Sequence, residues 1–270
     1  MPGKIEKLPA FLQNGRFFIT GTGTGVGKTF CSVILSWILS ARFPKGMYCK
    51  PIQTGGSGLD EIFFRKYCPA GWHARTLHNY TVPASPHLSS LLDQKKIMPE
   101  KLVRECRRVT NAADAVIVEG AGGLYVPIRG SFFMLDLMRE LGIMPVLAAY
   151  AGLGTLNHTL LSFHALKKEG VPPACIMVSD TEGSLWHTQK KKNNKNLIAE
   201  DNIQYILNYL KTPVIIVPHM ENIALGKIKI NYNAVSLIKI KKFSSRIVPC
   251  YAAWPCRASF EEFRHDRIRN

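Results

Sequence analysis

The sequence predicts an α/β fold, a three-layer sandwich in which helices cover both faces of a mostly parallel central sheet. Short apolar runs rich in β-branched residues alternate with longer amphipathic runs, which is the pattern of strands joined by helical crossovers. Strands are expected at residues 16–20, 46–50, 115–118, 144–149, 174–178 and 213–217. Helices are expected at residues 28–41, 99–108, 133–141, 156–169 and 197–210. Ligands of such sheets bind beyond the carboxyl ends of the strands.

The chain of 270 residues is long enough to bury one substantial core. We expect one domain over residues 14–237 and a basic C-terminal extension over residues 238–270, which contains Pro249 and Pro255 and shows no periodicity. The low-complexity run at residues 189–196 is expected to be a solvated surface loop.

Composition excludes several classes of protein. Hydrophobic residues make up 46% and charged residues 20%, as in ordinary globular proteins. No apolar run approaches the roughly 18 residues of a membrane-spanning helix, and the N-terminus lacks the apolar stretch of a signal peptide. We therefore expect a cytoplasmic protein without a membrane partner. The net charge is +16, which can indicate a nucleic-acid partner. However, no aromatic residues interleave with the lysines of residues 189–196 to stack on bases, so no nucleic-acid partner is expected.

A glycine-rich loop between the first predicted strand and the first predicted helix is the strongest motif. It consists of Gly21, Thr22, Gly23, Thr24, Gly25, Val26, Gly27, Lys28 and Thr29. Such glycines let backbone N–H groups face an anion, and the helix N-terminus adds positive potential. The lysine suits the β- and γ-phosphates of ATP, and the threonine hydroxyl suits Mg²⁺. The loop resembles that of P-loop NTPases, although Thr22 stands where the common pattern has its first glycine.

Two charged residues are expected at the carboxyl ends of predicted strands. Lys50 ends the second predicted strand, and Glu119 follows the third. A lysine at this rim is expected to point toward the ligand crevice. Mg²⁺ accepts one or two carboxylates together with a hydroxyl, phosphate oxygens and waters, so Glu119 and Thr29 are candidate ligands.

Further motifs follow the loop in a fixed order. They are Lys50-Pro51-Ile52-Gln53-Thr54-Gly55, Pro83-Ala84-Ser85-Pro86-His87, Val118-Glu119-Gly120-Ala121-Gly122-Gly123 and Gly152-Leu153-Gly154-Thr155-Leu156-Asn157-His158. With the loop, this set resembles the dethiobiotin synthetases over roughly residues 16–237. The resemblance implies a carbon–nitrogen ligase of biotin biosynthesis. In that family 7,8-diaminononanoate, CO₂ and ATP become dethiobiotin, ADP and phosphate, through a carbamate and a carbamic-phosphoric anhydride.

The resemblance also implies roles for individual residues. The catalytic group comprises Lys50, Lys28 and Thr24. The nucleotide group comprises Gly23, Thr24, Gly25, Val26, Gly27, Lys28, Thr29, Phe30, Glu119, Ser179, Asp180 and Pro218. The diamine group comprises Thr54, Ser85, His87, Gly122, Gly123, Leu153, Gly154, Thr155 and Asn157, and the Mg²⁺ ligands are Thr29, Asp60 and Glu119.

The resemblance also bears on the role of His87 and on the assembly of the diamine pocket. His87 either fixes its loop or binds substrate, because the spacing alone does not require a base there. The segment from Leu153 to Asn157 would reach the substrate carboxylate across a two-fold axis, which implies a homodimer with shared sites.

Three other functions remain as alternatives. An ATPase switch of the partitioning or metal-delivery type shares the fold, but it carries a second lysine where this chain has Gly23. A cobyrinate-type amidoligase would need a glutaminase domain with a catalytic cysteine. A binding protein that kept the fold and lost activity is favoured only by the basic extension and by the loop's lack of a carboxylate.

The chain departs from the family at the adenine position and in the phosphate loop. Relatives usually have an acidic residue at Gly23, often another at Gly25, and an asparagine at Ser179. A serine offers one hydroxyl in place of the donor and acceptor of an amide. We therefore expect weaker discrimination between ATP and other nucleoside triphosphates, which a strong preference for ATP in competition binding with GTP and CTP would refute.

Overall fold

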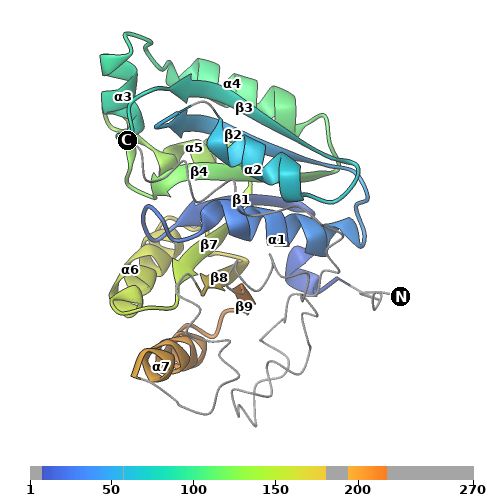
Figure 1. The fold of residues 1–270 in the computed structure, drawn as a ribbon, viewed down its shortest axis with the longest axis vertical. Coiled ribbons are helices and arrows are strands. Elements are labelled where there is room, and N and C mark those ends of the chain that lie inside the picture. Colours follow the sequence, from blue (N-terminus) through green and yellow to red (C-terminus); the bar gives the residue numbers. More distant parts are fainter. Residues whose placement is uncertain (1–7, 57, 181–193, 218–270) are drawn as a thin grey trace.

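The computed structural model describes residues 8–56, 58–180 and 194–217 (Figure 1). The expected extension at residues 238–270 and the nucleotide residue Pro218 lie outside these ranges. Residues 194–196, which we expected in a surface loop, instead begin helix α7 (Asn194–Leu210), so that part of the prediction was wrong. No helix of the described residues is long and apolar enough to cross a membrane.

The expected α/β fold is confirmed by a seven-stranded sheet in the order β3-β2-β4-β1-β7-β8-β9. Every neighbouring pair in this sheet is parallel. Its strands are β1 (Arg16–Gly21), β2 (Gly46–Thr54), β3 (Trp72–Tyr80), β4 (Ala115–Gly123), β7 (Met144–Tyr150), β8 (Cys175–Ser179) and β9 (Val214–Val217). A separate antiparallel pair joins β5 (Pro127–Arg129) to β6 (Phe132–Phe133).

Helices cover both faces of the sheet (Figure 1). On one face, α1 (Lys28–Ser40) and α2 (Leu59–Tyr67) pack in a core with alternate residues of the strands, such as Phe17 and Ile19 of β1. The intervening Phe18 packs on the other face. That face is covered by α4 (Pro99–Thr110), α5 (Met134–Leu141), α6 (Thr155–Lys168) and α7. A short helix α3 (Pro86–Leu92) and a 3-10 turn η1 (Ala10–Leu12) complete the described elements.

The sequence pattern missed β3, α2 and α3. The burial of β3 alternates over its first residues because it is an edge strand, so its sequence lacks a continuous apolar run. The two helices have 9 and 7 residues, too few to give a clear helical period.

Two strands extend further than predicted, and this changes the setting of the site. The pairing of β2 with β3 continues to Thr54, opposite Tyr80. The pairing of β4 with β1 reaches Gly123, opposite Gly21. Lys50 and Glu119 therefore lie within their strands, whereas we expected them at the rim.

Candidate nucleotide and metal site

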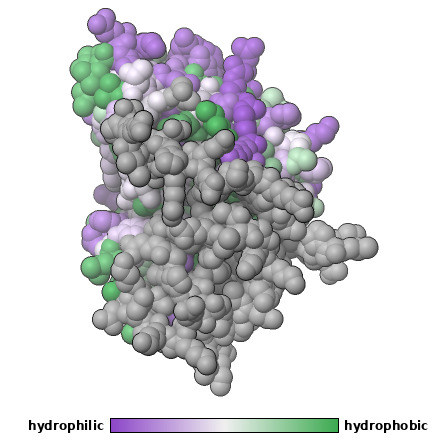
Figure 2. All heavy atoms as spheres, viewed as in Figure 1, coloured by the Kyte–Doolittle hydropathy of each residue, from purple (hydrophilic) through white to green (hydrophobic). Residues whose placement is uncertain are grey.

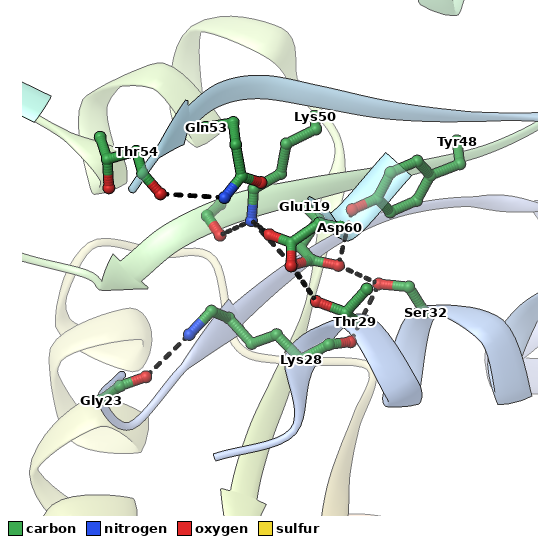
Figure 3. Close-up of polar contacts among 11 residues, drawn as sticks. Gly23, Lys28, Thr29, Ser32, Tyr48, Lys50, Gln53, Thr54, Asp60 and Glu119 are labelled. Carbon is green, nitrogen blue, oxygen red and sulfur yellow. Dashed lines mark hydrogen bonds and ion pairs between the residues drawn. The ribbon is translucent and has the colours of Figure 1, made fainter. Parts of the chain in front are cut away.

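The phosphate loop joins the end of β1 to the start of α1. Gly27 precedes the helix with a φ of 86°, a left-handed conformation that favours glycine. The backbone N–H of Thr22 donates to the carbonyl of Ala148 on β7, 2.9 Å away, which ties the loop to the neighbouring strand. The Lys28 ammonium donates to the carbonyl of Gly23, 2.8 Å away, so the lysine spans the loop (Figure 3).

Lys50 lies between two carboxylates contributed by different elements (Figure 3). Its Nζ is 2.8 Å from Oε1 of Glu119 on β4 and 2.7 Å from Oδ2 of Asp60 in the first turn of α2. A third contact of 3.3 Å reaches the carbonyl of Gly120. An ammonium has three hydrogens to donate, so these acceptors satisfy it completely. Only 3% of Lys50 is exposed, which contradicts the exposed rim position we expected.

Thr29 lies against the same two carboxylates. Its hydroxyl is 3.0 Å from Oδ1 of Asp60 and 3.0 Å from Oε1 of Glu119. One hydroxyl with two carboxylates is a set of hard oxygen donors that suits Mg²⁺, which completes its shell with phosphate oxygens and water. Within the ranges that the structure describes, no group of three or more His, Cys, Asp or Glu residues gathers to hold a metal. The oxygen donors of Thr29, Asp60 and Glu119 fit Mg²⁺.

Opposite charges favour the ionised forms of Lys50 and Asp60. Burial opposes the charge of Lys50, but Glu119 and Asp60 outweigh it and raise the pKa of Lys50 above its usual value. Burial likewise opposes ionisation of Asp60, but Lys50 lowers the pKa of that carboxyl. The stability from Lys50 is thus present below its unfolded pKa of 10.5 and lost at higher pH, as the pH rises through the folded pKa. The stability from Asp60 is present above pH 3.8 and lost as the pH falls through its folded pKa.

Sequence reasoning missed two hydroxyls that bond the other oxygen of Glu119. The Ser32 hydroxyl lies 2.7 Å and the Tyr48 hydroxyl 3.0 Å from Oε2. Spacing could have found both. Ser32 follows Lys28 by one helical turn, and Tyr48 precedes Lys50 by two positions in a strand, so each shares a face with an expected site residue.

Residues expected to bind the diamine lie at the same carboxyl edge of the sheet, but form separate groups. Gly122 has a φ of 70°, and a Cβ placed on it would lie 3.8 Å from the Thr24 hydroxyl, so the end of β4 adjoins the exposed part of the phosphate loop. Gly123 also lies close to the loop, because a Cβ there would lie 3.2 Å from the Gly21 carbonyl. Thr54 ends β2.

Ser85 and His87 contact each other and not the Lys50 cluster. The Ser85 hydroxyl is 2.9 Å from Nδ1 of His87, at the start of α3. Beyond them the exposed side of α3 is apolar, with Leu88, Leu91 and Leu92 at the surface, and Figure 2 shows hydrophobic atoms over this helix.

The remaining expected residues lie at the ends of β7 and β8. Gly154 precedes α6, Thr155 is its buried first residue, and Asn157 is exposed on its first turn. Leu153 is a large apolar residue that is 80% exposed in the single chain. Ser179 is the last residue of β8, and Asp180 follows it. Both are buried, so an adenine ring could contact the Ser179 hydroxyl only if that side chain became accessible.

The fold and the phosphate loop define a P-loop nucleotide-binding protein. A family model described as an AAA domain matches residues 15–224. The dethiobiotin synthetases of Brucella abortus and Brucella ovis, both named ATP-dependent dethiobiotin synthetase BioD, are 33% identical to this chain over 205 residues. The aligned part covers 71% of this chain and 89% of each of those proteins. The chain therefore belongs to the dethiobiotin synthetase family.

Solved structures give weaker likenesses. The cell-division ATPase MinD of Pyrococcus furiosus is 17% identical, with a TM-score of 0.47, over 83% of this chain and 96% of that one. A ParA family ATPase of Chlorobium tepidum is 12% identical, with a TM-score of 0.45, over 86% and 94%.

The protonation of Lys28 provides a direct test of the site's electrostatics. Burial, aided by the positive charge of Lys50, lowers the pKa of Lys28 to about 8. We expect the ¹³Cε NMR signal of Lys28, assigned with Lys28→Met, to titrate with a midpoint near pH 8 in the nucleotide-free protein. Added ADP should move the midpoint upward, because phosphate favours the charged ammonium. A nucleotide-free midpoint near that of an exposed lysine would contradict this electrostatic picture.

Proposed function

We propose that the chain is a dethiobiotin synthetase, which uses ATP and Mg²⁺ to close a cyclic urea on 7,8-diaminononanoate with CO₂. Family membership supports the reaction class, because the relatives named above carry that activity in their names. The observation that carries the proposal is the contact cluster beside the phosphate loop. Lys50, Asp60 and Glu119 come from three elements, and both carboxylates lie within hydrogen-bonding distance of the Lys50 ammonium and of the Thr29 hydroxyl.

The proposed chemistry requires positive charge at two groups. A carbamate oxygen is a weak nucleophile, and it must attack the γ-phosphorus of ATP to give the carbamic-phosphoric anhydride and ADP. The second amine then attacks the carbamate carbon, closes the ring and releases phosphate. In this proposal Lys28 binds the β- and γ-phosphates, and Lys50 binds the carbamate and the transferring phosphoryl group, while Thr24 adds a hydroxyl.

Thr29, Asp60 and Glu119 would hold Mg²⁺. When bound there, the ion would neutralise charge on the phosphates during transfer. Asp60 and Glu119 also bond Lys50, so a bound metal would share these carboxylates with the lysine. Loss of carboxylate partners to the metal would leave the Lys50 ammonium available to the carbamate and the γ-phosphate.

The diamine pocket and the subunit assembly complete the proposed site. Gly122 and Gly123 lie near the phosphate loop. Together with Thr54 at the end of β2, and with Ser85 and His87, they would line the diamine pocket. The segment formed by Leu153, Gly154, Thr155 and Asn157 would bind the substrate carboxylate in the second copy of a homodimer. The exposure of Leu153 supports such an interface. We also propose that residues 14–237 form the catalytic domain and that residues 238–270 are an extension to it.

Phosphate release distinguishes this proposal from an ATPase switch. Purified protein is given Mg-ATP and bicarbonate, with and without 7,8-diaminononanoate, and phosphate is measured over time. The proposal predicts release that depends on the diamine, with dethiobiotin formed in equal amount. Release that is indifferent to the diamine would support the switch.

Lys50→Met tests whether the lysine shares the carboxylates with the metal. We expect diamine-dependent phosphate release to fall by about 100-fold or more, as when a group that stabilises transition-state charge is removed. The same variant should bind Mn²⁺ on the order of tenfold more tightly in the absence of nucleotide, because the competing ammonium 2.8 Å from Glu119 is gone. Electron paramagnetic resonance of free Mn²⁺ measures this affinity.

Lys45→Met is the matched control, because Lys45 is an exposed lysine just before the same strand. It should leave both phosphate release and Mn²⁺ affinity unchanged. Equal effects of the two substitutions, or unchanged phosphate release in Lys50→Met, would contradict the role given to Lys50.

A further inference from the structure

Glu119 has different partners on its two oxygens (Figure 3). Oε1 bonds the Lys50 ammonium at 2.8 Å and the Thr29 hydroxyl at 3.0 Å, on the side of the nucleotide site. Among the residues that the structure describes, the partners of Oε2 are the neutral hydroxyls of Ser32 and Tyr48. Both of these residues are fully buried. The carboxylate therefore has one side toward the charged groups and one side toward the core.

Both hydroxyls donate their single hydrogen to the Glu119 carboxylate. The Ser32 hydroxyl also lies 3.0 Å from the carbonyl of Lys28, but it has one hydrogen, and the contact to Glu119 is shorter at 2.7 Å. The Tyr48 hydroxyl also carries one hydrogen and lies 3.0 Å from Oε2, and a carboxylate oxygen accepts. Tyr48 therefore donates a hydrogen bond to Oε2.

Tyr48 also contacts the helix that carries the second carboxylate. Its ring stacks on that of Phe64, with centroids 4.2 Å apart and planes 14° apart. Phe64 lies one helical turn after Asp60 on α2, and positions four apart share one face of a helix. One tyrosine thus packs against the helix of Asp60 and bonds the carboxylate of Glu119.

We propose that Ser32 and Tyr48 are positioning residues for the metal site. Their two hydrogen bonds hold Oε2 of Glu119 in the core and so keep Oε1 directed at Thr29, where a divalent cation would bind. This inference rests on the proposed function only in assigning the cation to Thr29, Asp60 and Glu119. Without these donors the buried oxygen has no partner, and the carboxylate turns to satisfy both oxygens from the nucleotide side.

The variants Ser32→Ala and Tyr48→Phe, singly and together, test the inference. Each removes one oxygen, and Tyr48→Phe keeps the ring on Phe64. The dissociation constant of Mn²⁺ is measured by electron paramagnetic resonance with saturating ADP, and that of ADP is measured separately without metal. We expect each single variant to bind Mn²⁺ about tenfold more weakly or worse, which is the usual effect of losing a partner of a metal ligand. Affinity for metal-free ADP should stay within about twofold.

Ser36→Ala is the matched control for Ser32→Ala. Ser36 lies one turn further along α1, is fully buried, and donates to the carbonyl of Val33, 2.6 Å away, and not to Glu119. It should leave Mn²⁺ affinity unchanged. The inference is overturned if Ser32→Ala and Tyr48→Phe bind Mn²⁺ as tightly as this control does, or if metal-free ADP binding weakens as much as metal binding. The diamine is absent from these measurements, so their outcome is independent of whether the diamine is the substrate.

Discussion

The buried ion pairs of Lys50 with Glu119 and Asp60 are the interaction on which the site depends. A lysine that is 3% exposed is costly to bury unless its charge is paired and its hydrogens are bonded. Here the partners come from β4 and from the start of α2, so pairing requires both elements to lie against β2. The same requirement brings two carboxylates next to the first residues of α1. The electrostatic need of one side chain thus assembles groups that are distant in the sequence.

The local charges of this cluster balance in the structure. Lys28 and Lys50 supply two positive charges, and Asp60 and Glu119 supply two negative ones. A divalent cation would bind next to the negative charges of Asp60 and Glu119. The phosphates of a nucleotide would bind next to the positive charge of Lys28. Such preorganised charge lowers the cost of rearrangement during phosphoryl transfer. The two lysines nevertheless differ, since Lys28 has its pKa lowered and Lys50 has its pKa raised.

The sequence allowed the fold and the loop to be predicted because each has a local pattern. Buried parallel strands are continuous apolar runs, and the phosphate loop is one contiguous motif between a strand and a helix. The burial of Lys50 was not predictable, because it depends on how far β2 pairs with β3, an edge strand with a polar sequence. The hydroxyls of Ser32 and Tyr48 escaped notice because each is separated by many residues from Glu119. Their helical and strand spacing to Lys28 and Lys50 was a usable signal.

The measurement that tests the central claim most directly is a crystal structure of the complex with Mg²⁺ and a non-hydrolysable ATP analogue. The account predicts a metal held by the Thr29 hydroxyl together with Glu119 and Asp60. It also predicts that the Lys50 ammonium has exchanged at least one carboxylate for the γ-phosphate. A complex in which Lys50 keeps both carboxylates while the metal binds elsewhere would contradict the account.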